Sequence, residues 1–371
     1  MPASGVAGSL ASTQPAAESG GGVVPFFYGS NLYAQKFGSV DPTQLDADSH
    51  EFTYNVVPGG FLRGVRLQMR STGGVIGAGA VAADAPWSVY SSIKLENVDG
   101  SEIMKPIGGF GSYVWQRFTR PWWGDPAKRR DYSNSVNPAG TLLTAPEIRH
   151  TAGVLANTDA RSQYRITYTL APSNKVYSTA PTTTATVSIT KYAEIWAQPD
   201  AADQHGNSIE PLPPGLNIAT VRRHQMFGLN AADADNILQL GLTGNEIRCL
   251  ILVVRDSNNA RQDYLSDPIR WNMDNRNLGV YSPDEVFDHM EDFYDQLSNG
   301  TSTRPTGVYV FPRFYQPGQM KGSAWLGTTN ATYLTWETAT AGGAVNLPGT
   351  VEVITDEVVP VGAVPMELES I

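Results

Sequence analysis

The chain contains only one cysteine, Cys249, among its 371 residues. A single thiol can form neither a disulfide within the chain nor a metal centre built from several thiolates. Charged residues are also scarce, at 17% against about 25% in an ordinary soluble domain. Because hydrophobic residues reach 41%, the sequence can build a large core and does not have the composition of a disordered chain.

Long apolar runs and excess positive charge are absent as well. No stretch approaches the roughly 18 apolar residues that a membrane-spanning helix needs. Residues 1–24 contain no lysine or arginine and no apolar core, so they do not resemble a secretory signal, and we expect a mobile arm. The net charge of -10 argues against the phosphate backbone of nucleic acid as the main partner. We expect a soluble chain made in a reducing compartment.

Glycine and proline are plentiful, with 36 and 25 residues, and they divide the chain into short elements. Apolar and polar residues alternate strictly in many of these pieces, for example from Val65 to Met69 and from Tyr164 to Leu170. This period of two is typical of strands with one buried face, so the sequence predicts an all-β fold. A length of 371 residues predicts two domains.

The predicted strands occur twice in the same order along the chain. Segments 51–57, 62–70, 87–98, 164–170 and 185–196 match segments 236–242, 246–255, 268–273, 307–311 and 350–359 in turn. This repetition favours two jelly-roll β-sandwich domains with short helices in long loops, although a plainer Greek-key sandwich stays open. The predicted parts are a flexible N-terminal arm, a first jelly roll, a second jelly roll and a C-terminal tail, at residues 1–34, 35–215, 216–362 and 363–371.

One helix is predicted in the second half. Ser282, Pro283 and Glu285 form a capping box with proline at the first helical position. The apolar stripe that follows consists of Val286, Met290, Phe293 and Leu297. We expect the acidic residues between them to form a solvated face of this helix.

Motifs for catalysis or metal binding are missing. The five histidines have no ligand spacing, and Asp233 and Asp235 lack the glycine and distal glutamate of a calcium loop. The glycine-rich run 108–111 lacks the lysine and helix context of a phosphate site. The sequence therefore predicts no catalytic residue, no cofactor and no metal.

Aromatic and basic residues are interleaved in segment 115–132. Such a segment can stack nucleobases, but aromatic residues and arginine are also enriched at protein interfaces. Because the chain is acidic and has 19 arginines against 7 lysines, we favour a subunit interface. The candidate interface residues are Trp115, Arg117, Phe118, Arg120, Trp122 and Trp123.

Several segments together resemble a known family. They are the turn and strand 58–64, the segment 83–87 and the strand 93–98 in the first half, and segments 304–309, 331–334 and 348–353 in the second. Over residues 35–362 the chain resembles double jelly-roll major capsid proteins of tailless, membrane-containing bacteriophages such as tectiviruses.

The resemblance implies a structural protein rather than an enzyme. In that family three chains form a pseudo-hexagonal capsomer, and capsomers tile an icosahedral shell. The implied partners are further copies of the chain and other capsid, vertex or membrane proteins of the virion, without sequence-specific nucleic-acid binding. The implied location is the virion, after synthesis in the host cytoplasm.

An alternative is a two-domain jelly-roll protein that binds glycans or releases them by hydrolysis. Trp122 or Trp123 would then offer a platform for a sugar, and a pair of carboxylates would act as acid and base. The sequence singles out no such pair. A secretory signal and disulfides, which are usual in secreted enzymes of this kind, are also missing.

Overall fold

A computed structural model of the chain describes most of residues 30–360. The described parts are Phe26, 30–119, 140–144, 154–197, 201–202, 208–209, Pro213, 218–241, 244–274, 276–294, 304–313, 325–328 and 331–360. Within them, no helix is both long and apolar enough to cross a membrane. The predicted arm, residues 1–24, lies outside these parts.

The first half of the chain forms two facing sheets. One has the order β1-β12-β4-β8, with β2 beside β12 and β9 beside β4, and the other has the order β7-β6-β10-β3. Their bounds are Leu32–Phe37 (β1), Thr43–Gln44 (β2), His50–Asn55 (β3), Gly60–Thr72 (β4), Tyr90–Glu96 (β6), Glu102–Ile107 (β7), Gly140–Thr144 (β8), Leu155–Asn157 (β9), Arg165–Leu170 (β10) and Thr186–Trp196 (β12).

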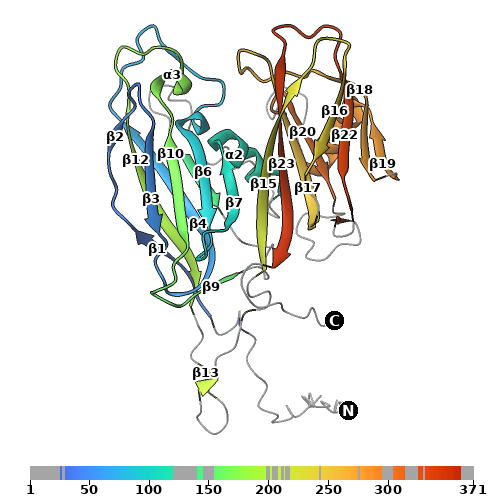
Figure 1. Ribbon diagram of the computed structural model, residues 1–371. Helices are drawn as coiled ribbons and strands as arrows, with labels where there is room; N and C mark the ends of the chain where they lie inside the picture. Colours follow the sequence, from blue (N-terminus) through green and yellow to red (C-terminus); the bar gives the residue numbers. More distant parts are fainter. Residues whose placement is uncertain are drawn as a thin grey trace, which may run out of the picture.

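The second half repeats this arrangement. Its strands run in the orders β20-β17-β23-β15, with β21 beside β17, and β16-β22-β18-β19. Their bounds are Ile218–Leu229 (β15), Asp235–Leu240 (β16), Glu246–Arg255 (β17), Leu265–Met273 (β18), Arg276–Tyr281 (β19), Val308–Pro312 (β20), Leu326–Gly327 (β21), Leu334–Thr340 (β22) and Gly349–Pro360 (β23). Figure 1 shows the two halves standing side by side.

Short elements complete the fold. Two small ribbons pair β5 with β11 and β13 with β14. The remaining elements are Ala80–Val81 (β5), Trp87–Val89 (η1), Gly109–Thr119 (α2), Ser173–Val176 (α3), Tyr177–Thr179 (β11), Ala201–Ala202 (β13), Ser208–Ile209 (β14) and Pro283–Tyr294 (α4).

The two halves have the same topology, which confirms the predicted pair of jelly rolls. β12 lies between β1 and β4 just as β23 lies between β15 and β17, and β10 lies between β3 and β6 just as β22 lies between β16 and β18. Helix α2 follows β7, and helix α4 follows the corresponding strand β19.

One predicted correspondence is wrong. Segment 164–170 contains β10, whose counterpart is β22, whereas segment 307–311 contains β20, which pairs with β17 as β8 pairs with β4. The error has a physical reason. Alternation shows that a segment is a strand with a buried face, but it does not show which strand lies beside it.

The duplication extends to a β-bulge. The register between β12 and β4 skips Arg63, and the register between β23 and β17 skips Arg248. Each bulged arginine lies near an acid on the neighbouring strand, with nitrogen–oxygen distances of 3.6 Å for Arg63 and Glu194 and 2.8 Å for Arg248 and Asp356. Because a bulge sets where a side chain points, these arginines mark equivalent positions in the two domains.

The helix predictions have mixed outcomes. The predicted helix start is confirmed, because the Glu285 amide donates to the N-cap oxygen Ser282 Oγ at 3.1 Å, and Val286 and Met290 are buried. The Phe293 side chain and Leu297 lie outside the described residues. Helix α2 was not predicted, because its first turn contains two glycines, which are poor helix formers.

The first strand begins earlier than expected. The sequence predicts an arm up to residue 34 and a first clear strand near residue 51, but β1 begins at Leu32 and pairs with β12 along its length. The predicted domain boundary near residue 215 falls between β14 and β15, and the domain limits stay a prediction.

Candidate functional site at the domain junction

The two jelly rolls share a continuous sheet. Strand β15 of the second domain runs parallel to β7 of the first, with Arg222 opposite Met104, and this contact joins a four-stranded and a five-stranded sheet into one sheet of nine strands. Figure 1 shows β7, helix α2 and β15 together at the centre of the molecule. The junction is therefore built from the backbone as well as from side chains.

Arg222 lies at the centre of this junction and is fully buried. Its Nη1 donates to Ser112 Oγ at 3.0 Å, and its Nη2 donates to the carbonyl oxygens of Ile93 and Lys105, both at 3.0 Å. All three acceptors belong to the first domain. Burial lowers the pKa of Arg222 to about 9, against the opposing effect of Glu352, so the guanidinium stays charged at neutral pH.

A second contact joins the domains through Asp84, in the loop between β5 and η1. One carboxylate oxygen lies 2.6 Å from Arg255 Nη2, and the other accepts a hydrogen bond from Arg261 Nε at 2.7 Å. Both guanidinium groups also lie over the ring of Phe110, at 5.4 Å and 4.5 Å from its centroid. Two cations of the second domain thus hold one anion and one aromatic ring of the first.

Helix α2 is wedged between the domains, and its glycines allow the close approach. A Cβ atom on Gly109 would lie 2.1 Å from the Trp87 carbonyl oxygen. A Cβ atom on Gly111 would lie 2.6 Å from Ile107 Cδ1 and 2.9 Å from Glu352 Oε1. The glycine-rich run 108–111 lacks the lysine of a phosphate-binding site, and its glycines allow tight packing of α2 instead.

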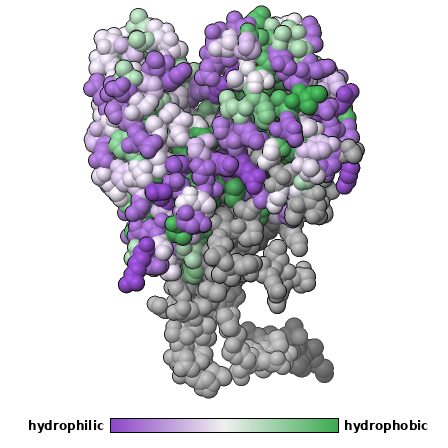
Figure 2. Space-filling view, in the orientation of Figure 1, coloured by the Kyte–Doolittle hydropathy of each residue, from purple (hydrophilic) through white to green (hydrophobic). Residues whose placement is uncertain are grey.

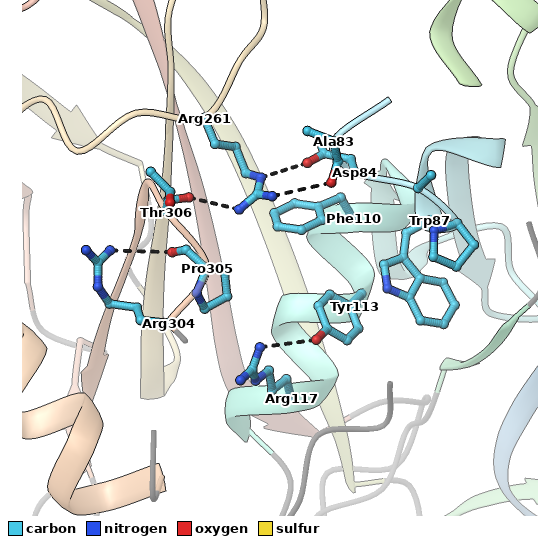
Figure 3. A pocket seen from close by; sticks show the side chains of 12 residues that line it. Ala83, Asp84, Trp87, Phe110, Tyr113, Arg117, Arg261, Arg304, Pro305 and Thr306 are labelled. Carbon is cyan, nitrogen blue, oxygen red and sulfur yellow. Dashed lines mark hydrogen bonds and ion pairs between the residues drawn. The ribbon is translucent and has the colours of Figure 1, made fainter. Parts of the chain in front are cut away.

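A pocket of about 330 Å³ opens beside this junction. Figure 3 shows Trp87, Phe110 and Tyr113 on the first-domain side and Arg261, Arg304 and Thr306 on the second-domain side. The dashed lines that cross between the two sides run from Arg261 to Ala83 and Asp84. Its arginines are already engaged: Arg304 binds Asp263 through two hydrogen bonds of 2.7 Å and 2.9 Å, and Arg117 donates to Tyr113 at 3.2 Å. The pocket is therefore a structural crevice between the domains.

Among the described residues, this pocket has no pair of carboxylates of the kind that the glycan-hydrolase alternative needs. Asp84 is the single carboxylate among the residues that line it, and two arginines bind it. Glycoside hydrolysis usually needs two carboxylates facing one sugar. Elsewhere among the described residues, no group of three or more histidine, cysteine or acidic side chains is placed to hold a metal ion.

The predicted interface residues fall into two groups. Trp115 and Phe118 are buried inside the chain, so these two belong to the internal junction rather than to a surface offered to another subunit. Arg117 is half-buried, with its guanidinium 5.3 Å from the Phe118 ring. Residues Arg120, Trp122 and Trp123 lie outside the described parts, and their interface role stays a prediction.

Sequence reasoning missed the residues that hold the junction. Asp84, Arg222, Arg255 and Arg261 stand in unremarkable strands and loops. One signal was present, because an arginine follows the bulged arginine by seven positions in both domains, at Arg70 and Arg255.

One face of the molecule is mostly polar. Figure 2 shows one face of the molecule, where hydrophilic residues dominate and hydrophobic residues gather over the upper part of the second domain. Among large apolar side chains of the second domain, Met226, Ile237, Val280 and Val345 are more than half exposed. Ile237 on β16 and Val280 on β19 belong to the sheet that lies away from the junction, whereas Met226 lies on the junction strand β15.

Comparisons with known proteins find similarity in structure only. No protein family and no curated protein matches the sequence. The crystal structure of the STIV MCP is similar with a TM-score of 0.62 at 12% identity, covering 92% of this chain and 100% of that one. PBCV-1 VP54, fitted into a reconstruction of the virophage Sputnik, has a TM-score of 0.57 at 10% identity, with 89% and 93% covered.

A third similar structure is the major capsid protein P2 from bacteriophage PM2. Its TM-score is 0.54 at 9% identity, covering 88% of this chain and 97% of that one. At such identities the likeness concerns the fold alone. It confirms, for nearly the whole chain, the double jelly-roll architecture that the sequence predicts.

Proposed function

We propose that this chain is the major capsid protein of an icosahedral virus and that three copies form a pseudo-hexagonal capsomer. The observation that carries the proposal is the junction itself. Two jelly rolls of equal topology stand side by side, and strand β7 of one lies against strand β15 of the other. A chain of this kind presents two similar units to its neighbours.

The free sheet edges support a closed ring. The counterparts of β7 and β15 are β19 and β1, and each of these lies at the edge of its sheet among the described strands. If β19 of one copy meets β1 of the next, the internal junction is repeated between chains. Such a head-to-tail contact closes when the rotation fits, and three chains then give six similar units around one axis.

The structural neighbours support the same function. The three named above are the STIV MCP, a major capsid protein and a protein fitted into a virophage reconstruction, and each is covered almost completely. The proposal places this chain in the virion shell, after synthesis in the host cytoplasm. Its partners are other copies, neighbouring capsomers and further proteins of the virion, and it needs no enzymatic activity.

The mass of the purified chain in solution tests the proposal. Light scattering is expected to give about 120 kDa, three times the 40.1 kDa chain, over a wide range of concentrations. Electron micrographs of the same sample should show hexagonal outlines. A monomer at all concentrations would overturn the capsomer.

A further inference from the structure

The two domains differ in how their corresponding sheets are covered. Strand β17 is buried on both faces from Ile247 onward, because its inner face packs in the core and its outer face lies under α2. Ile251 and Val253 on that outer face, and Ile354 beside them on β23, are fully buried. The corresponding strand β4 buries its inner face, while its outer face stays partly open.

The bulged arginines define which residues correspond. Counting three and five positions from Arg63 reaches Arg66 and Gln68, and the same steps from Arg248 reach Ile251 and Val253. Tyr192 lies opposite Arg66, as Ile354 lies opposite Ile251. An apolar outer face in the second domain is therefore matched by a polar one in the first.

This polar surface is positively charged. We name it the basic face and define it by Lys36, Arg66, Arg70 and Tyr192. Lys36 lies opposite Tyr192 in the sheet and is exposed, as is Arg70. The Arg66 guanidinium lies 4.9 Å from the centroid of the Tyr192 ring, and its buried Nε has no hydrogen-bond acceptor among the described residues.

One acid shares the basic face. Glu194 lies 3.6 Å from Arg63 and 3.8 Å from Arg66. Those contacts are enough to balance one positive charge. Lys36, Arg70 and one of the two arginines around Glu194 leave the face with a surplus of positive charge.

The two corresponding helices, α2 and α4, also differ in polarity, as the two sheet faces do. Helix α2 is buried on nearly every side and has no acidic residue. Helix α4 buries Val286 and Met290 against its own domain. Its other side is exposed and carries four acids, which we name the acidic face and define by Asp284, Glu285, Asp288 and Asp292.

We propose that the acidic face of α4 docks on the basic face of a second copy of this chain. The contact would repeat, between chains, the relation of α2 to β17 and β23 within one chain. It rests on the proposed capsomer and specifies which surfaces hold it together. In both contacts the helix and the sheet face suit each other chemically. Inside the chain a mostly apolar helix covers an apolar sheet face, and between chains an acidic helix would cover a basic sheet face.

The difference in chemistry has a reason. The contact of α2 with Ile251, Val253 and Ile354 forms once, during folding, so this part of the internal junction can be apolar. The contact between chains forms by diffusion of soluble subunits, and opposite charges speed such encounters and fix their register.

Charge reversal in the full chain tests the proposal. One variant carries Arg66→Glu and Arg70→Glu, a second carries Asp288→Arg and Asp292→Arg, and a third combines all four changes. The control is Lys175→Glu, because Lys175 is exposed on α3, away from both faces. Light scattering in about 0.05 M salt gives the mass, since screening is weak there.

Each single-sided reversal is expected to convert most of the 120 kDa species to the 40.1 kDa chain, and the combination is expected to restore it. Circular dichroism checks that every variant is folded; the helix variant changes only exposed positions. A trimer that persists in either folded single-sided variant overturns the docking and leaves the capsomer standing. Failure of the folded combination to recover also overturns the docking, and a monomeric wild type overturns both proposals.

Discussion

Arg222 Nη1 donates a hydrogen bond to Ser112 Oγ over 3.0 Å, and this contact crosses from the second jelly roll to the first. The same guanidinium reaches two backbone carbonyls of the first domain. The charged guanidinium is thus buried away from water at the centre of the molecule. Hydrogen bonds to acceptors of the other domain offset the cost of this burial.

Replacing Arg222 is expected to destabilise the chain strongly. Arg222→Leu leaves the two carbonyls and Ser112 without their donor in a buried place, which should lower the free energy of unfolding by roughly 2–4 kcal/mol. Urea unfolding measures the change. Arg161→Leu, at an exposed turn, is the control and should change it little. A loss below about 0.5 kcal/mol for Arg222→Leu would contradict the central role.

Removing the charge of Asp84 is expected to loosen the two domains. Asp84→Asn leaves Arg255 and Arg261 without their anion, both in mostly buried positions, and should cost roughly 2–3 kcal/mol of stability. Limited proteolysis should also cut the chain faster near the junction. Asp159→Asn, in an exposed turn, provides the comparison. Equal cleavage rates in the two variants would show that the contact does not hold the domains.

Gly109→Ala is expected to destabilise the chain even though alanine favours helices. The added methyl group would meet the Trp87 carbonyl at 2.1 Å, and such overpacking costs about 1–3 kcal/mol, more than the gain of about 1 kcal/mol in helix propensity. Gly228→Ala is the matched control, since nothing lies within 4 Å of its Cβ position. Thermal unfolding of both variants decides the matter. A Gly109→Ala chain more stable than the control would contradict the close packing.

Lys191 is expected to give the stability an alkaline pH dependence. Burial lowers its pKa to about 8, an effect that nearby Asp41 opposes and Lys36 reinforces, while its ammonium group lies over the Tyr54 ring and donates to the Ser39 carbonyl. Since the unfolded chain holds this proton up to about pH 10.5, the unfolded state binds more protons between pH 8 and 10.5.

Stability of the wild type should therefore rise over that pH window relative to Lys191→Met, because deprotonation removes the cost of a buried charge. Urea unfolding of both proteins at pH 7 and pH 9.5 measures the difference, and other titrating groups cancel in the comparison. A difference that stays constant with pH would show that Lys191 is not perturbed.

Trp122 and Trp123 are expected to lie in a contact between subunits. A tryptophan pair on an open surface would form an apolar patch, which soluble proteins usually avoid. Changing both to Ser should weaken trimers or particles while the β-sheet circular dichroism stays the same. Unchanged assembly would refute this interface.

The sequence predicted the fold better than the site. Alternation and turn residues were enough for the all-β class, the duplication and the cap of α4, because each depends on neighbours along the chain. The predicted counterpart of β10 in the second domain was wrong, and α2 was missed, because strand pairing and the burial of Gly109 are set by distant segments. The bonds of Asp84 and Arg222 likewise arise only when the two domains meet.

The sheet that continues from β7 into β15 has a mechanical consequence. Because Arg222 and Asp84 also join the two domains there, we expect the two jelly rolls to move as one rigid unit. A closed shell is curved, even when the chains that build it are rigid. In a particle of the proposed kind, curvature would come from the tilt between neighbouring capsomers, and each chain would keep its shape wherever it sits.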